Sequence, residues 1–151
     1  MEASGVETYG NLVDELARRD GYAVERRDKA TTIVEFDMGR GRHQTVWVRY
    51  QGEDADGNYL VTMSSAVLKL RTGEKLDVER ANYLLRENAK LAHGAWAIDE
   101  GVDENDEYDY LVMTETRFAQ TLEPQELIES VIAVAELADA MENVLTGRDI
   151  F

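Results

Sequence analysis

The sequence contains no cysteine, which excludes disulfide bonds, thiolate metal sites and cysteine nucleophiles. It has no apolar run long enough to span a bilayer, so we expect no membrane-spanning helix. The first ten residues, MEASGVETYG, are acidic and lack the apolar segment of a signal peptide. These absences together predict a soluble, cytoplasmic protein without a membrane partner.

Basic residues are scarce. The chain has 16 Lys and Arg residues against 31 Asp and Glu residues, which gives a formal net charge of −15 at pH 7. Nucleic acids and anionic membrane surfaces are bound through clusters of positive charge, and the sequence contains no basic stripe. We therefore expect no nucleic-acid partner. A basic partner, a cation and adaptation to high salt are each compatible with this composition.

Catalytic signatures are missing as well. The sequence lacks the Walker A, GxGxxG, HExxH and GxSxG motifs. Its two histidines, His43 and His93, are fifty residues apart, and no further ligands can be assigned to a metal site that they would share. We interpret both as structural histidines, and we expect no catalytic residue, no metal ligand, no cofactor and no enzymatic activity.

The sequence does contain enough apolar residues for one folded domain. Its 151 residues are 44% hydrophobic, which fits a single domain over residues 1–151. Ser4 and Glu7 have the spacing of a helix capping box, so a helix is predicted over residues 5–20. The apolar residues of this helix recur at helical spacing: Val6, Tyr9, Leu12, Val13 and Leu16.

Six segments rich in β-branched and aromatic residues are predicted to be strands. Four of them form a meander with the sequences YAVERR, TTIVEFDM, HQTVWVRYQ and NYLVTMSSAVL. In the third, Thr45, Trp47 and Arg49 alternate with apolar residues and therefore share one face. The last two strands, AWAID and EYDYLVMTE, are separated by an acidic loop.

Two further helices complete the chain. One is predicted to begin near Asp77 and to end at Gly94, between the fourth and fifth strands. The other begins at Glu123-Pro124, because Pro is tolerated in the first turn, and runs to about Leu145. The order α-ββββ-α-ββ-α predicts an α+β fold with two layers, an antiparallel sheet with helices packed on one face.

Two acidic segments raise the question of a cation site. The segment DADGN, residues 54–58, looks like the start of an EF-hand loop. Counting from Asp54 puts Tyr59 and Ser65 where such a loop needs Gly and Glu, so we predict a hairpin turn. In the loop of residues 99–109, seven of eleven residues are acidic. We favour a solvated hairpin loop there, with a cation site as the alternative.

Two helices carry candidate binding residues. Tyr9, Val13 and Leu16 predict an apolar surface on which a polypeptide partner docks, with burial in the core as the alternative. The second helix has a narrow seam interrupted by one polar residue: Val78, Ala81, Leu85, Asn88 and Ala92. This seam predicts a homodimer interface whose register is set by the Asn. Packing of the same stripe on the chain's own sheet is the alternative.

The segment LLREN, residues 84–88, is followed by GAWAID, residues 94–99. Paired leucines, an Asn near the helix end and a small-residue strand closing on Asp resemble the same passage in type III secretion chaperones, the Tir-chaperone family. The segment from Leu122 to Asp139 resembles the last helix of those chaperones and of the YbjN-like proteins of the same superfamily. Gly21-Tyr22 and the four-strand meander are similar to the YbjN-like proteins.

The resemblance covers about residues 5–146 and implies helices packed on a twisted sheet, usually in a dimer without enzymatic activity. It also implies that an effector-like polypeptide segment is held unfolded around the dimer. We therefore expect a non-enzymatic polypeptide-binding module, a dimeric chaperone-like or adaptor protein. The alternative is a small-ligand or cation-binding protein, or an enzyme, that uses the acidic 99–109 loop. Exposed apolar patches would favour the first, and a deep polar pocket the second.

Overall fold

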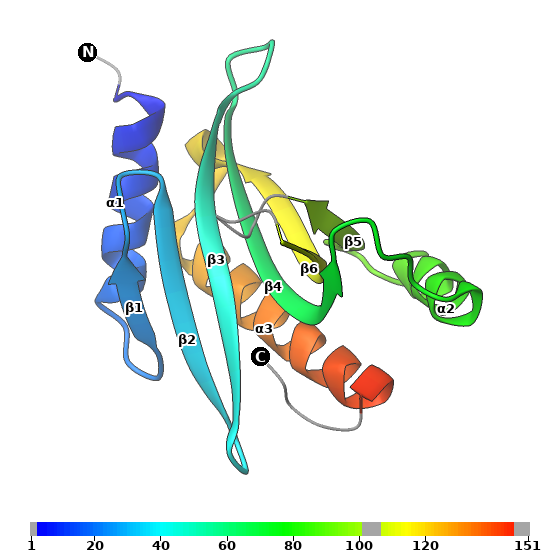
Figure 1. Ribbon diagram of the computed structural model, residues 1–151. Helices are drawn as coiled ribbons and strands as arrows, with labels where there is room; N and C mark the ends of the chain where they lie inside the picture. The colour runs from blue at the N-terminus through cyan, green and yellow to red at the C-terminus, as the bar shows by residue number, and fades with distance from the viewer. Residues whose placement is uncertain (1–2, 101–106, 147–151) are drawn as a thin grey trace.

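Three helices and six strands follow the predicted order in the computed structural model, which describes residues 3–100 and 107–146 (Figure 1). The helices are α1 (Gly5–Ala17), α2 (Val78–Asn88) and α3 (Pro124–Thr146), with a short 3-10 helix η1 (Ala119–Thr121) before α3. The strands are β1 (Ala23–Arg26), β2 (Thr31–Gly39), β3 (Arg42–Glu53), β4 (Tyr59–Arg71), β5 (Ala95–Glu100) and β6 (Tyr108–Phe118). The predicted α+β class and element order are confirmed.

Local sequence signals account for several boundaries. Ser4 caps α1, because its hydroxyl accepts a hydrogen bond from the Glu7 backbone N–H at 3.2 Å. The β2–β3 hairpin turns at Gly39-Arg40-Gly41, where all three residues have positive φ angles. The two glycines adopt this backbone without steric cost, and the tight turn then forces it on Arg40 at φ 56°.

Residues 54–58 form the β3–β4 hairpin turn, as predicted. The Asp54 carboxylate accepts hydrogen bonds from the backbone N–H groups of Asp56 and Asn58, both at 2.9 Å, and from the Asn58 side chain at 3.0 Å. The Asn58 side chain is the main cause that lowers the pKa of Asp54, followed by these backbone groups. The Asp54 carboxylate is thus used to build the turn itself.

The prediction that α2 extends to Gly94 is wrong, because the helix ends at Asn88. The Asn88 side chain binds the backbone of Trp96, which turns the chain back towards the sheet. Gly94 instead lies just before β5 with φ 79°, and its backbone approaches β6 closely. A Cβ atom at this position would lie 3.0 Å from the Met113 sulfur and 3.1 Å from the Thr114 carbonyl oxygen, so glycine fits best.

The six strands form one antiparallel sheet in the order β1-β2-β3-β4-β6-β5. β4 pairs with β3 on one side and with β6 on the other, and β1 and β5 are the edge strands. A register shift between Ala66 and Leu68 marks a bulge in β4 where it pairs with β6. Because the chain passes through α2 after β4, β6 can enter the sheet between β4 and β5.

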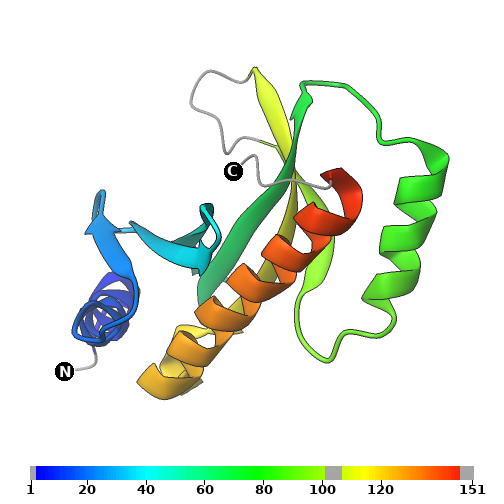
Figure 2. The same cartoon turned by 90° about the horizontal axis from the view of Figure 1, so that it is seen from below.

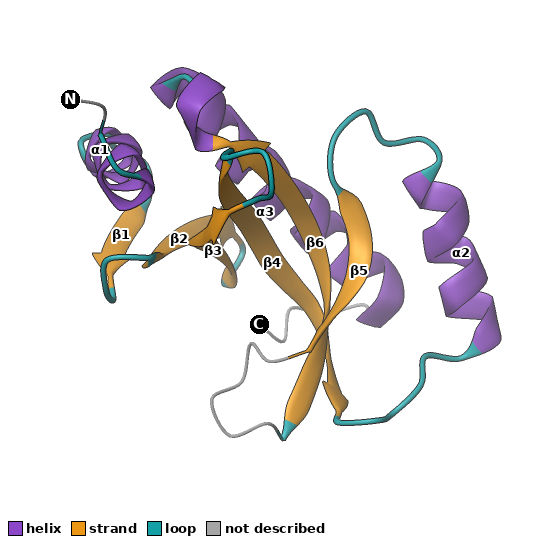
Figure 3. Ribbon diagram, turned by 90° about the horizontal axis from the view of Figure 1, so that it is seen from above, coloured by secondary structure: helices purple, strands orange, loops and turns teal. Residues whose placement is uncertain are grey.

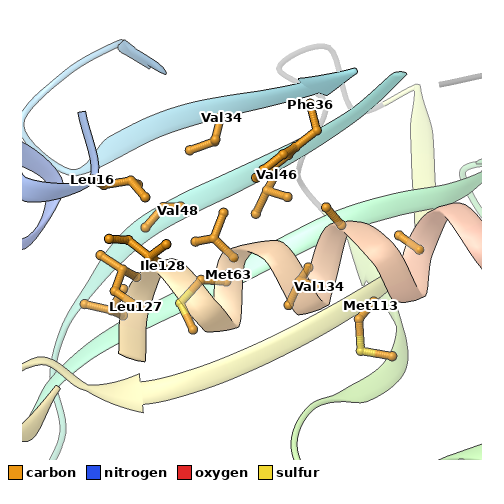
Figure 4. Close-up of a cluster of buried hydrophobic side chains, with 14 of the residues drawn as sticks. Leu16, Val34, Phe36, Val46, Val48, Met63, Met113, Leu127, Ile128 and Val134 are labelled. Atoms are coloured by element: carbon orange, nitrogen blue, oxygen red, sulfur yellow. The ribbon is translucent and has the colours of Figure 1, made fainter. Parts of the chain in front are cut away.

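The hydrophobic core lies between the sheet and two of the helices. α3 packs across β3, β4 and β6, and α1 packs against β3 and α3. Figure 4 shows the strand residues Val46, Val48 and Met63 facing Leu127 and Val134 of α3, and all five are buried. Side chains that alternate along the strands therefore meet a helical stripe, which is the two-layer arrangement that the sequence predicts.

Helix α2 lies apart from the other two helices, beyond the β5 edge (Figures 2 and 3). Leu84 is the one α2 residue that is buried. It lies beside Trp96 and Leu111, whose side chains point to the same face of the sheet as the core. A single large apolar side chain thus anchors α2 to the sheet, and most of the remaining helix surface is exposed.

Candidate functional site

Helix α2 is held in place at both of its ends. At its start, the Asp77 carboxylate accepts a hydrogen bond from the Arg80 backbone N–H at 2.8 Å. The Arg80 guanidinium reaches the Leu145 carbonyl oxygen at the end of α3, at 3.4 Å. This contact fixes which side of α2 faces α3.

At the end of α2, Asn88 forms two hydrogen bonds with the backbone of Trp96. Its side-chain oxygen accepts from the Trp96 N–H at 2.6 Å, and its side-chain nitrogen donates to the Trp96 carbonyl at 3.2 Å. The amide of Asn88 is therefore used within the chain, where the sequence predicts a register-setting role between two chains. Ala92 is exposed and lies beyond the end of α2, so it is not part of a helical seam.

Three apolar side chains are strongly exposed beside this anchor. The exposed fractions are 73% for Val78, 67% for Leu85 and 46% for Ile98. Val78 and Leu85 are seven residues apart and lie on the same side of α2, whereas Arg80 lies on the opposite side, towards α3. We call Val78, Ala81, Leu85 and Ile98 the α2–β5 surface. It borders a groove of about 210 Å³ between the helix and β5.

The outer edge of β5 is only partly closed. Because the Trp96 N–H is bound by Asn88, it points away from β6. Ile98 and Glu100 follow at two-residue steps, so their backbone N–H and C=O groups point the same way. Within the described residues, no side chain hydrogen-bonds to the backbone of Ile98 or Glu100. In the described part of the chain, no hydrogen bond joins these backbone groups to a residue outside the sheet, and α2 lies beside β5 across the groove (Figure 3).

On the side of α2 next to Val78 and Leu85, the two ends of the helix carry charges of opposite sign. Arg80 pairs with the N-cap residue Asp77, and Lys90, just after the C-cap, pairs with Glu87. Glu79 and Arg86 are also seven residues apart on one side of the helix, and neither is in an ion pair with another described residue. The side next to Val78 and Leu85 thus carries a negative charge near its start and a positive charge near its end.

The prediction that Tyr9, Val13 and Leu16 bind a partner is not supported by their positions, because all three are completely buried. The Tyr9 hydroxyl donates to the Val48 carbonyl at 2.7 Å and lies 2.8 Å from the Thr32 hydroxyl. These contacts attach α1 to β2 and β3. The alternative reading of the stripe, as core, is correct, because the sheet and α3 cover the apolar side of α1.

The two histidines, the other residues considered as metal ligands, lie in different parts of the fold. His93 is exposed and lines a polar cleft with Glu115 and Arg117, whereas His43 lies at the start of β3. Within residues 3–100 and 107–146, no cluster of His, Asp and Glu is arranged to hold a metal ion. Most of the predicted acidic loop, residues 101–106, lies outside the described residues.

No protein-family model and no curated protein matches the chain. The described helices include none with the length and apolar character to cross a membrane.

The sequence pattern identifies Val78 and Leu85, but Ile98 and the open β5 edge depend on the order of strands in the sheet. The alternation of AWAID puts Ile98 with Trp96 on one face, which is the one signal that points to it.

Proposed function

We propose that the protein is a non-enzymatic homodimeric module that binds a polypeptide segment, and that the α2–β5 surface makes both contacts. The observation that carries this proposal is an exposed apolar helix flank, Val78 and Leu85, beside an open strand edge. The arrangement agrees with the resemblance to type III secretion chaperones and YbjN-like proteins, which also implies a dimer and a polypeptide partner.

A second copy of the chain is the occupant that best fits the helix flank. When two α2 helices pack antiparallel about a two-fold axis, Val78 of each faces Leu85 of the other. The same arrangement brings Glu79 of each copy beside Arg86 of the other, whereas a parallel pair would bring like charges together. The flank is therefore complementary to itself in both apolar contacts and charge. The exposed Leu85 side chains are removed from water in this pair.

The open edge of β5 fits an extended polypeptide segment. Ile98 and Glu100 offer backbone donors and acceptors to an added strand, and the adjoining groove of about 210 Å³ accepts an apolar side chain. The net charge of −15 and the carboxylate of Glu100 favour a segment that also carries basic residues. Binding of this kind weakens as salt concentration rises.

Replacing Ile98 with proline tests strand addition, because proline removes the outward N–H without removing a hydrogen bond to β6. Peptides are first selected from a random phage-displayed library against the wild-type protein. We expect Ile98→Pro to weaken the best peptide by about tenfold or more in calorimetry, the change expected for one lost backbone hydrogen bond of about 1.4 kcal/mol.

The matched control is Ile98→Val, which keeps the N–H and most of the apolar surface. It should bind the selected peptide within about threefold of wild type. Equal affinity of Ile98→Pro and wild type would contradict strand addition at this edge. A failure to select any peptide would contradict the proposed binding function itself.

A further inference from the structure

The face of the sheet opposite α1 and α3 carries two oppositely charged side chains and two aromatic ones. Trp47 and Arg49 of β3 point to this face, because they alternate with Val46 and Val48 of the core. The register places Ala97 and Asp99 of β5 on the same face. No described helix covers it (Figures 2 and 3). We call it the open face.

The open face is concave along one diagonal. Arg49 and Asp99 approach to 4.0 Å between Nη1 and Oδ2, although β4 and β6 lie between their strands. The twist of an antiparallel sheet brings such opposite corners towards each other. Small side chains form the floor beneath them, and Ser64, Ala66 and Val112 are buried although no described helix covers them.

Aromatic residues adjoin both members of this ion pair. The Arg49 guanidinium lies over the Trp47 ring, 5.8 Å from its centroid, and Asp99 pairs in register with Tyr110. Trp47 and Tyr110 also line a cavity of about 210 Å³ together with Gln44, Thr45 and Ala66. An apolar space with aromatic walls is thus next to one positive and one negative charge.

The ion pair is poorly arranged for a structural role. No hydrogen bond joins Arg49 to Asp99 at 4.0 Å, and both side chains are partly buried. Burial raises the pKa of Asp99 and lowers the pKa of Arg49, and each group offsets part of this effect on the other. Taking these charges partly out of water has a cost that a weak contact at 4.0 Å offsets only in part, and groups with shifted pKa values cluster at functional sites.

We propose that the open face binds a free α-amino acid with a large apolar side chain, through Arg49, Asp99, Trp47 and Tyr110. The ligand carboxylate contacts Arg49, its ammonium group contacts Asp99, and its side chain enters the cavity between the two aromatic rings. Each charge of the ligand then lies beside a charge of opposite sign on the protein. None of these four residues belongs to the proposed contact between two α2 helices, so the site is tested independently of the dimer.

The chemistry of the site favours a zwitterion over other small ligands. A carboxylic acid without an amine is attracted by Arg49 but repelled by Asp99, and an amine without a carboxylate experiences the reverse. The two charges of an α-amino acid are joined through one carbon atom, a separation that suits the closely spaced Arg49 and Asp99. The ends of a peptide are too far apart to satisfy both residues.

The test is an NMR titration of the folded full-length protein with L-phenylalanine, L-leucine and L-tryptophan. We expect saturable shifts of the amide signals of Trp47, Arg49, Ala97 and Asp99, with a Kd of about 1 mM or tighter for at least one of the three. Phenethylamine and 3-phenylpropionate each lack one of the two charges, and in the dipeptide Gly-Phe the two charges are farther apart. Each of the three should bind at least about tenfold more weakly than L-phenylalanine.

Two variants separate binding from folding. Arg49→Lys keeps the positive charge but loses the forked guanidinium, and Asp99→Asn loses the negative charge, so each should weaken binding at least about tenfold. Unchanged dispersion of the remaining amide signals shows that each variant is folded. The proposal is overturned if none of the three amino acids gives saturable shifts, if the single-charge analogues bind equally well, or if both folded variants bind like wild type.

Discussion

Replacing Leu85 with aspartate is expected to convert the proposed dimer into a monomer. In the proposed antiparallel pair, each copy would bury the new carboxylate against Val78 of the other, without a positive partner. An uncompensated buried charge costs about 3–5 kcal/mol, so the dimer should weaken by at least about a hundredfold. Light scattering at tens of micromolar protein, a range where a dimer with a Kd of about 1 μM or tighter is mostly associated, measures this change directly.

A matched control is present on α3. Val144 is 63% exposed, close to the 67% of Leu85, but it belongs to α3 and is not among the residues that line the groove between α2 and β5. Val144→Asp should therefore leave the mass in solution unchanged. If the wild type is already monomeric at the same concentration, or if both variants dissociate the dimer equally, the assignment of the interface to α2 is incorrect.

Replacing Leu16 with alanine is expected to lower the free energy of unfolding by about 2–5 kcal/mol. Leu16 is completely buried between α1, the sheet and α3, so the substitution leaves a cavity in the core. This is a large part of the total stability of a domain of this size, which is on the order of 5–15 kcal/mol. Urea denaturation followed by circular dichroism measures the loss.

Val144→Ala is the control for this experiment, because it shortens an exposed apolar side chain and should change stability by less than about 0.5 kcal/mol. The comparison also separates the two interpretations of the α1 stripe. A partner-binding role predicts that Leu16→Ala reduces peptide affinity while the unfolding curve stays unchanged. That pair of results would contradict the assignment of Leu16 to the core.

The α1 stripe shows what helical periodicity can and cannot predict. Tyr9, Val13 and Leu16 do share one side of the helix, as their spacing requires. Periodicity identifies the apolar side but does not say whether it faces the chain's own sheet or a partner. Here the sheet covers it, because α1 packs on β3 and the Tyr9 hydroxyl is bonded to the Val48 carbonyl.

The order of elements was predictable because each has a local cause. Alternating strands, glycine turns and the Ser4 cap depend on neighbouring residues, and the structure has them where the sequence predicts. The end of α2 was not predictable in this way. It depends on the hydrogen bonds between Asn88 and Trp96 across a loop, and the close approach of Gly94 to β6 becomes evident only in the folded sheet.

The candidate sites were likewise predictable where they depend on neighbouring residues, and not where they depend on contacts between distant ones. Val78 and Leu85 were predicted as part of a seam, and the alternation of β3 puts Trp47 and Arg49 on one face. The meeting of Arg49 with Asp99 requires the strand order β3-β4-β6-β5 and the twist of the sheet, which are set by pairings between distant residues. The open edge at Ile98 likewise follows from β6 entering between β4 and β5.

Disulfide cross-linking through an introduced cysteine tests the central claim most directly, because the natural sequence contains no cysteine that would compete. Asn82 is exposed and lies midway between Val78 and Leu85, so antiparallel pairing brings Asn82 of one copy close to Asn82 of the other. Under mild oxidation, Asn82→Cys should form a species of twice the 17.1 kDa chain mass on a non-reducing gel, and Val144→Cys should not. Equal cross-linking of both variants, or none for Asn82→Cys, would contradict a dimer built on α2.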